Sequence, residues 1–259
     1  MVRVCYYKDM KQNTSWGKVA PWYDKVVSHD DSYQTNVILP NMSRIVGARK
    51  GMEVLDVACG QGFLSHALAS SGAHVVGVDI APELIAIAKK HASHNEEFYV
   101  SPAHNLSAFK PLSFDTVVIV LALQNIEHIA PVFREVARVI KKGGSFVIVL
   151  NHPAFRIPDK SSWSFDEEKK IQYRRIEEYL SESRKKIDMK PGNPGKEFTL
   201  SFHRPLQVYS KTLANAGFAI SRIEEWTSHK ESESGPKKQA EDKARKEIPL
   251  FMCLECLKI

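Results

Sequence analysis

The chain has 259 residues, 43% of them hydrophobic and 25% charged, which suits one large domain or a domain with an elaborated cap. No apolar run approaches the roughly 20 residues that cross a bilayer, and the first eight residues lack the apolar core of a signal peptide. We therefore expect a cytoplasmic protein without a membrane partner. The net charge of +6 admits nucleic acid, but basic and acidic residues are interleaved, so a solvated surface of mixed charge is favoured.

Residues 1–50 are predicted to form an N-terminal arm and covering helices. Residues 1–15 are polar and aperiodic, and Trp16 to Tyr23 is rich in aromatic side chains. Residues 33–48 have helical periodicity despite Pro40, and a Lys-Gly pair at 50–51 then marks the turn into the first strand.

Residues 51–150 alternate between apolar runs and helical patterns, which predicts a parallel sheet covered on both faces. The expected strands are 53–58, 74–79, 96–100, 114–120 and 144–150, and the expected helices are 62–71, 82–93 and 130–141. Pro82 is well placed in the first turn of its helix.

The first strand runs into a glycine-containing turn, Asp56-Val-Ala-Cys-Gly60-Gln-Gly62, followed by a helix. Backbone can approach a ligand closely at such glycines, and the helix start offers free N–H groups. A dinucleotide site favours a third glycine where this chain has Ser65, and Asp56 would repel a pyrophosphate. Asp56 instead suits an ammonium group, and Asp79, at the end of the next strand, suits ribose hydroxyls. Ribose and ammonium without pyrophosphate describe S-adenosylmethionine.

These motifs resemble those of class I S-adenosylmethionine-dependent methyltransferases of the small-molecule type, and the resemblance covers roughly residues 20–259. It rests on Val54–Gly62, Val75–Ile80, Phe114–Val120 and Val139–Ser145. The resemblance implies a Rossmann-like α/β fold, doubly wound on a seven-stranded sheet of order 3-2-1-4-5-7-6 with strand 7 antiparallel. It also implies S-adenosylmethionine as cofactor and S-adenosylhomocysteine as product. The cofactor-binding residues expected from it are Asp56, Ala58, Gly60, Gly62, Asp79, Ile80, Ala103, His104 and Leu121.

Three further segments bear on the expected site. Pro102 stands where the family commonly has an acidic residue, so backbone groups of Ala103 and His104 are expected to hold the adenine edge. After the fourth strand, Gln124 and Asn125 could line the acceptor pocket or cap the next helix. The Trp22-Tyr23-Asp24 triplet is expected to open a helix over the cofactor, with Tyr23 near the acceptor, or else only to pack that helix on the sheet.

Residues 151–202 are an insertion between the fifth strand and a helix at 203–216, where a short connection would suffice. They include an amphipathic stretch at 166–186 and a turn-rich flap at 189–196. The amphipathic stretch carries Ile171, Tyr173, Ile176, Tyr179 and Leu180 on one face. We interpret the insertion as an acceptor-binding cap, with a stabilising cover as the alternative. His152 and His203 at its ends are candidate bases. Candidate cations for an anionic acceptor, in a pocket or on a helix surface, are Arg156, Arg174, Arg175 and Arg204.

Residues 203–259 are predicted to complete the core with a helix at 206–216 and strands at 218–226 and 248–257. Cys253 and Cys256 lie three apart in the last strand, so they should point to opposite faces as free thiols. No compact set of carboxylates occurs at the strand ends, so no metal is expected.

We therefore predict a methyltransferase acting at oxygen or nitrogen of a small, anionic acceptor. An RNA or protein methyltransferase that uses the basic surface is the alternative within this class, although nucleic acid is not favoured. An NAD-dependent oxidoreductase and a cofactor-binding protein without catalysis are the alternatives of other classes.

Overall fold

The structure is a computed structural model that describes residues 15–27, 29–189 and 197–259. Residues 1–14 of the expected N-terminal arm, and residues 190–196 of the expected flap, lie outside the described residues. No helix in the described ranges is long and apolar enough to cross a membrane.

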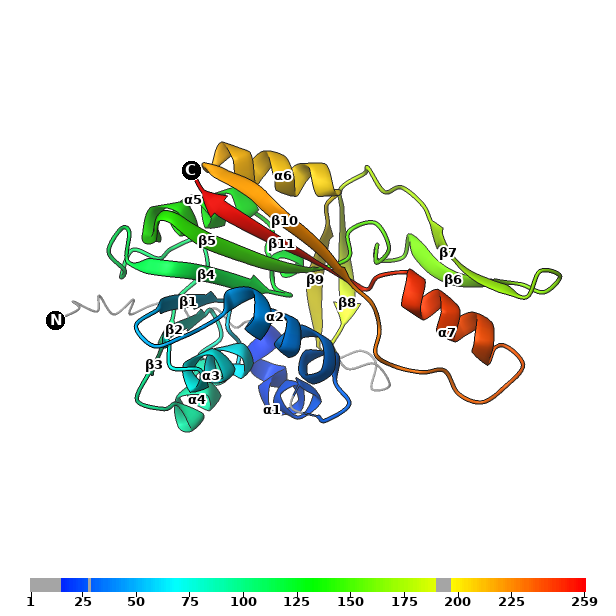
Figure 1. Cartoon of the computed structure of the whole chain (residues 1–259), viewed down its shortest axis with the longest axis horizontal. Helices are drawn as coiled ribbons and strands as arrows, with labels where there is room; N and C mark the ends of the chain where they lie inside the picture. The colour runs from blue at the N-terminus through cyan, green and yellow to red at the C-terminus, as the bar shows by residue number, and fades with distance from the viewer. Residues whose placement is uncertain (1–14, 28, 190–196) are drawn as a thin grey trace.

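A seven-stranded sheet forms the centre of the chain (Figure 1). Its strands lie in the order β10-β11-β5-β4-β1-β2-β3, and the first five strands along the chain pair in parallel. β11 pairs antiparallel with both β5 and β10, which confirms the predicted strand order and the antiparallel seventh strand. The bounds are β1 Glu53–Val57, β2 His74–Asp79, β3 Glu96–Val100, β4 Phe114–Val120, β5 Ile140–Asn151, β10 Phe218–Trp226 and β11 Phe251–Lys258.

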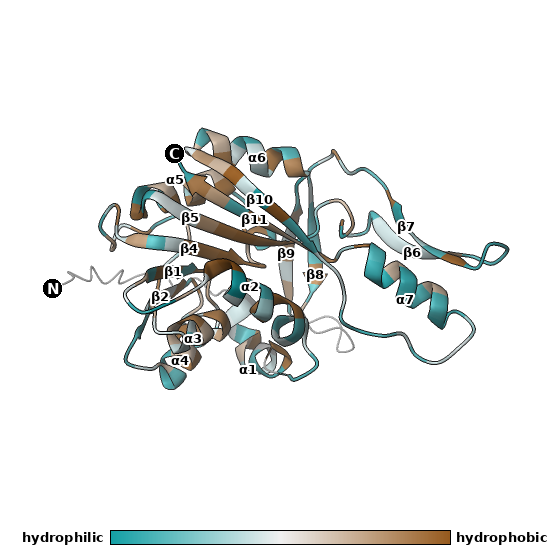
Figure 2. Cartoon of the chain, viewed as in Figure 1, coloured by the Kyte–Doolittle hydropathy of each residue, from teal (hydrophilic) through white to brown (hydrophobic). Residues whose placement is uncertain are grey.

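Helices cover both faces of the sheet, because its central strands are apolar on both sides (Figure 2). One face packs against α5 (Ile129–Val139) and α6 (Leu206–Asn215), with Phe133 against Phe146 at its core. The other face packs against a π-helical turn η1 (Gln34–Ile38), α2 (Leu39–Val46) and α3 (Phe63–Ser70). α4 (Pro82–His91) contacts β3, and α1 (Ser15–Val27) contacts α4.

The helix expected over 33–48 consists of two segments, and Pro40 accounts for the division. Pro40 lies in the first turn of α2, where its missing N–H costs nothing. The wider π turn of η1 precedes it, and left-handed Gly47 ends α2. The helical prediction was correct, but the single uninterrupted helix was not.

Residues 152–189 and 197–203 contain two pairs of antiparallel strands beyond the carboxyl ends of the parallel strands (Figure 1). The first hairpin pairs β6 (Ser161–Asp166) with β7 (Ile171–Ile176), and the second pairs β8 (Ser183–Asp188) with β9 (Phe198–His203). The stretch 166–186 is therefore not helical. The Asp166 carboxylate accepts the N–H groups of Glu168 and Lys169 and so fixes a turn at the start of this stretch. Four of its apolar side chains are exposed, namely Ile171, Tyr173, Ile176 and Leu180.

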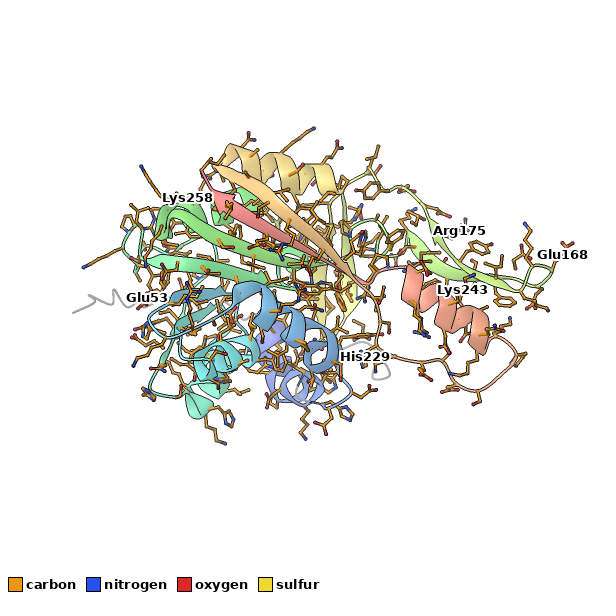
Figure 3. The ribbon with its side chains drawn as sticks, viewed as in Figure 1. Glu53, Glu168, Arg175, His229, Lys243 and Lys258 are labelled. Carbon is orange, nitrogen blue, oxygen red and sulfur yellow. The ribbon has the colours of Figure 1, made fainter. Side chains whose placement is uncertain are left out.

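The charged segment from His229 to Glu247 contains a helix that the sequence did not predict, α7 (Lys238–Glu247), which contacts β7. The Asp242 carboxylate accepts from Lys238 Nζ within the helix at 2.9 Å and from the N–H of Ser232 at 2.7 Å. Figure 3 shows Lys243 of α7 beside the hairpin that carries Glu168 and Arg175, away from the central sheet. Local ion pairs and contact with β7 thus order a segment whose composition indicated only a solvated surface.

The C-terminal cysteines point to opposite faces of β11, as their spacing predicted. Cys253 packs in the core on the α2 side and Cys256 in the core on the α5 side. Both thiols are free, and burial raises the pKa of each to about 12. Cys59, also free, lies in the glycine turn.

Candidate cofactor and acceptor site

The turn between β1 and α3 holds a buried carboxylate. Asp56, in β1, is 2% exposed, and the Ser65 hydroxyl donates to its Oδ2 at 2.7 Å. Ser65 therefore occupies the position of the missing third glycine as a hydrogen-bond donor. Gly60 and Gly62 are both left-handed, with φ of 59° and 86°. The chain thus turns sharply over Asp56 and exposes backbone N–H groups at the start of α3.

Asp79 ties this turn to the end of β2. Its carboxylate accepts the N–H of Gly60 at 3.0 Å and the N–H of Ala81 at 2.8 Å. Ile80, which follows it, is half-buried. The sequence placed Asp56 and Asp79 in one site, and the structure brings them together around Gly60.

Burial perturbs the ionisation of both carboxylates. Burial raises the pKa of Asp56 to about 7, and the charge of Asp79 adds to the rise. Burial also raises the pKa of Asp79, although the N–H groups of Ala81 and Gly60 oppose that shift. A cation placed beside Asp56 would favour its ionised form and so reverse part of the rise in its pKa.

Two residues other than glycine are left-handed at neighbouring strand ends. Ala58 follows β1 with φ of 59°, and Leu121 follows β4 with φ of 52°. Such residues cost about 1 kcal/mol or more and cluster at functional sites. The parallel strands β1 and β4 are adjacent, so the two residues lie at the same edge of the sheet, where ligands bind in open α/β folds.

Sequence reasoning missed a pair behind Gly62, formed by buried Glu96 and half-buried His66. The Glu96 side chain, 2% exposed, accepts hydrogen bonds from Ser93 and from Nδ1 of His66. His66 Nε2 has no hydrogen-bond partner among the described residues, and a Cβ added to Gly62 would lie 2.9 Å from it. The His66–Glu96 pair therefore packs behind Gly62 and supports the glycine turn. Its only sequence signal is a histidine four residues after Gly62, which is too weak to single out.

The segment after β3 lies beside Asp79, because the N–H of Ser101 donates to the Asp79 carbonyl at 2.9 Å. Ala103 is half-buried and His104 is exposed. Both therefore lie near the carboxylate expected to hold the ribose. Their expected contact with adenine remains a prediction.

A residue that follows β4 forms a hydrogen bond to strand β9 of the insertion. Asn125, in a short 3-10 helix η2 (Leu123–Asn125), donates to the carbonyl of Leu200 in β9 at 2.9 Å. The N-cap of α5 has no side-chain hydrogen bond, so neither Gln124 nor Asn125 caps that helix. Gln124 Nε2 donates to the Leu121 carbonyl, and its covered Oε1 has no partner among the described residues.

Arg204 is 5% exposed, and its guanidinium hydrogen-bonds to the backbone of the chain. It donates to the carbonyls of Leu123, Ile126 and Glu127. This geometry supports a role in fixing η2 and does not support the expected contact with an anionic acceptor.

The two candidate bases differ in their hydrogen bonding. His152 Nε2 donates to Glu225 Oε1 at 2.7 Å, and its Nδ1 accepts the N–H of Ala154 at 3.2 Å. Burial lowers the pKa of His152 despite the Glu225 carboxylate. Both of its nitrogens are therefore occupied. His203 Nε2 donates to the Tyr179 carbonyl at 2.8 Å, which leaves the lone pair on Nδ1.

The three other candidate arginines occupy different settings. Arg156 NH1 donates to the side chain of Asn151, the last residue of β5, at 2.9 Å, and the guanidinium lies over the Phe251 ring. No carboxylate among the described residues pairs with Arg156. Arg174 donates to the Phe155 carbonyl and to Ser161, and exposed Arg175 pairs with Glu177. Of these three arginines, only Arg156 both lies at the end of a central strand and has no ion-pair partner among the described residues.

Helix α1 and strand β9 lie beside this edge. β9 contacts both α1 and η2, so the second hairpin reaches from the N-terminal helix to the end of β4. Tyr23 lies within α1, but its side chain falls outside the described part of the structure. Among the described residues, no group of three or more His, Cys, Asp or Glu side chains is arranged to hold a metal ion.

Residues 55–148 match the model of a family described as "Methyltransferase domain". A curated relative, the ubiquinone biosynthesis O-methyltransferase of Xanthomonas campestris pv. campestris, is 37% identical over 108 residues. That match covers 40% of this chain and 45% of the relative, so the chain matches less than half of the relative's length.

Two solved structures are similar over most of the chain. An S-adenosylmethionine-dependent methyltransferase of Mesorhizobium loti is 25% identical with a TM-score of 0.68, over 84% of this chain and 96% of that protein. One from Listeria monocytogenes is 25% identical with a TM-score of 0.62, over 81% and 92%. Residues 55–148 thus form a methyltransferase domain, and the chain has the fold of the class I methyltransferases whose cofactor is S-adenosylmethionine.

Proposed function

We propose that the chain transfers the methyl group of S-adenosylmethionine to oxygen or nitrogen of a small anionic molecule. The observation that carries this proposal is the turn at Gly60 and Gly62, with Asp56 buried below it and Asp79 bound to it. Methyl transfer from a sulfonium is an in-line displacement, so positioning of the two reactants can supply most of the catalysis.

In this proposal the cofactor lies across the carboxyl ends of β1, β2 and β4. Asp79 accepts the ribose hydroxyls and Asp56 compensates the ammonium group. The backbone from Ala58 to Gly62 passes beside the amino-acid part of the cofactor. Ile80, Ala103 and His104 border the adenine, and Leu121 borders the methyl group. The parallel register supports these proposed positions, because it brings these strand ends to one edge of the sheet.

The acceptor would lie at the neighbouring end of β5. Arg156 offers an unpaired cation there, and the rings of Phe251 and Tyr33 pack beside each other with centroids 5.6 Å apart. Gln124 offers an unpartnered amide oxygen. These groups suit an aromatic ring that carries a carboxylate. The name of the Xanthomonas relative favours oxygen as the attacked atom.

A hydroxyl acceptor must lose a proton, and we propose that His203 accepts it. The Tyr179 carbonyl fixes the proton of His203 on Nε2, so Nδ1 can act as a base. His152 would have to break a hydrogen bond to Glu225 or to the backbone before it could do so.

Cofactor choice is tested first, by calorimetric titration of the purified chain with S-adenosylmethionine, S-adenosylhomocysteine and NAD. We expect binding of the first two and none of NAD. Binding of NAD alone would support an oxidoreductase and contradict the proposal.

The acceptor is tested by release of S-adenosylhomocysteine with hydroxybenzoates and with matched phenols that lack the carboxylate. We expect turnover of the carboxylates only, and a higher KM with little change in kcat in Arg156→Gln. Arg175→Gln is the matched control and should behave as the unsubstituted chain. Equal turnover of the two series, or no effect of Arg156→Gln, would refute an anionic acceptor held by Arg156. A chain that binds the cofactor and methylates neither series would instead point to a polymer acceptor or to a binding protein.

A further inference from the structure

A cavity opens at the amino ends of the central strands, away from the cofactor edge. It has a volume of about 490 Å³ and lies between the turn before β1, the start of β4 and the turn that opens β5. Figure 3 places Glu53, the first residue of β1, at this end of the sheet. The cavity is lined by residues 49–52, 115–116 and 141–145.

The lining carries an excess of positive charge. It contains Arg49, Lys50, Lys141 and Lys142 but a single carboxylate, Asp115. Lys141 Nζ pairs with Asp115 Oδ1 at 2.6 Å, and the N–H of Glu53 donates to Asp115 Oδ2. Within the described ranges, the other three cations form no ion pair with a carboxylate. The cavity therefore holds four cations beside one carboxylate, and three of the four form no ion pair within the described ranges.

Neighbouring groups respond to this charge. Burial would raise the pKa of Asp115, but the Glu53 N–H and the Lys141 and Arg49 charges hold it below its usual value. Lys258 lies close by, and its Nζ donates to the Ile140 carbonyl. Burial, and then the charge of Lys142, lower the pKa of Lys258. An anion in the cavity would relieve this repulsion.

The cavity also offers neutral donors and open backbone. The Oγ of Ser145 is covered and has no hydrogen-bond partner among the described residues. Gly51 and Gly143 have no other atom within 4 Å of where a Cβ would lie, so a ligand can approach their backbone closely. A buried hydroxyl without a partner is costly unless a ligand or water satisfies it.

We propose that this cavity binds a phosphate group carried by a small molecule. A phosphate has three terminal oxygens, which matches a set of several cations with a hydroxyl better than a single carboxylate would. The volume falls within the range of small-molecule sites. The proposal does not depend on the methyltransferase activity, because the strands separate the cavity from the cofactor edge.

The test is calorimetric titration with inorganic pyrophosphate in low salt, with saturating S-adenosylhomocysteine present to occupy the cofactor site. We expect one saturable site per chain. The double variant Lys50→Glu/Lys142→Glu should weaken binding by about tenfold or more, because reversing two charges removes attraction and adds repulsion. The matched control is Lys89→Glu/Lys90→Glu, which reverses two exposed lysines of α4 that are not in the lining of this cavity. Its affinity should be unchanged.

Several results would overturn the proposal. These are an absence of saturable binding, equal affinity in the two double variants, or binding that is seen only when S-adenosylhomocysteine is left out. A short RNA that binds at this surface while pyrophosphate does not would assign it to nucleic acid instead. The milder variant Lys142→Gln, checked by circular dichroism, guards against misfolding and should weaken binding by a smaller factor.

Discussion

The buried carboxylate Asp56 predicts opposite effects on stability and on cofactor binding. Its pKa is about 7 in the folded chain, against 3.8 for a free side chain, because burial disfavours the charged form. The folded state therefore holds the proton more tightly than the unfolded state does. The stability that this proton provides is complete below about pH 4 and is lost as the pH rises toward 7.

The size of the effect follows from the two pKa values. About three pKa units correspond to roughly 4 kcal/mol in the limit, and about 2.5 kcal/mol of this falls between about pH 5 and pH 8. Asp56→Asn removes the titrating group while keeping the shape and an acceptor for the Ser65 hydroxyl. We expect the variant without cofactor to gain stability relative to the unsubstituted chain as the pH rises, by up to about that amount.

Cofactor affinity should increase as the pH rises, whereas the stability that the Asp56 proton provides is lost. If Asp56 compensates the ammonium group, the unsubstituted chain should bind S-adenosylhomocysteine about tenfold more tightly at pH 8 than at pH 6, because only the ionised form is competent. Asp56→Asn should bind more weakly at both values and without this dependence.

Urea unfolding across the pH range and calorimetric titration measure the two effects separately. The reasoning fails if the stability difference between Asp56→Asn and the unsubstituted chain is independent of pH. It also fails if the variant loses stability at pH 8 or keeps the pH dependence of binding.

Three further predictions concern the support of the site. Gly62→Ala places a Cβ 2.9 Å from His66 Nε2 at a φ of 86°, so it should abolish cofactor binding and cost about 1–3 kcal/mol of stability. Its matched control, Gly217→Ala, has φ of 84° and open space, so thermal unfolding should show about 1 kcal/mol lost with binding intact. Glu96→Gln loses a charged acceptor for Ser93 and His66 and should cost about 1–3 kcal/mol in urea unfolding, whereas an unchanged midpoint would contradict its supporting role. Asn125→Ala removes the bond to β9 and should speed hydrogen exchange in that strand, with cofactor affinity unchanged. Equal exchange rates in the two proteins would show that this bond does not hold the insertion.

The sheet and the cofactor turn could be predicted because their signals are local. Strands buried on both faces are continuous apolar runs, and β2, β3 and β4 begin and end at the predicted residues. Gly60, Gly62 and the two aspartates lie within one strand–turn–helix unit and the strand that follows. Register in a parallel sheet then places their side chains at one edge without further information.

The insertion could not be predicted in the same way, because its pattern fits more than one structure. The apolar residues from Ile171 to Leu180 match a helical face, yet they lie largely in an exposed hairpin and the loop after it. A short apolar pattern does not separate helix from strand. Here the turn at Asp166 and strand pairing decided the result. α7 likewise depends on ion pairs and on contact with β7, which composition does not reveal.

The amino-acid sequence alone determined the class of fold, the cofactor and the position of the two carboxylates. Tertiary structure decided which side chains remain available for chemistry. His152 is bound to Glu225, Arg204 to carbonyls near Leu123, and Asn125 to β9, while Arg156 and His203 Nδ1 keep free capacity. The partners of His152, Arg204 and Asn125 lie about 70 or more residues away along the chain. His152 and Glu225, for example, are separated by 73 residues. Periodicity and spacing describe only neighbours in sequence, so no local pattern could assign these hydrogen bonds before the chain was folded.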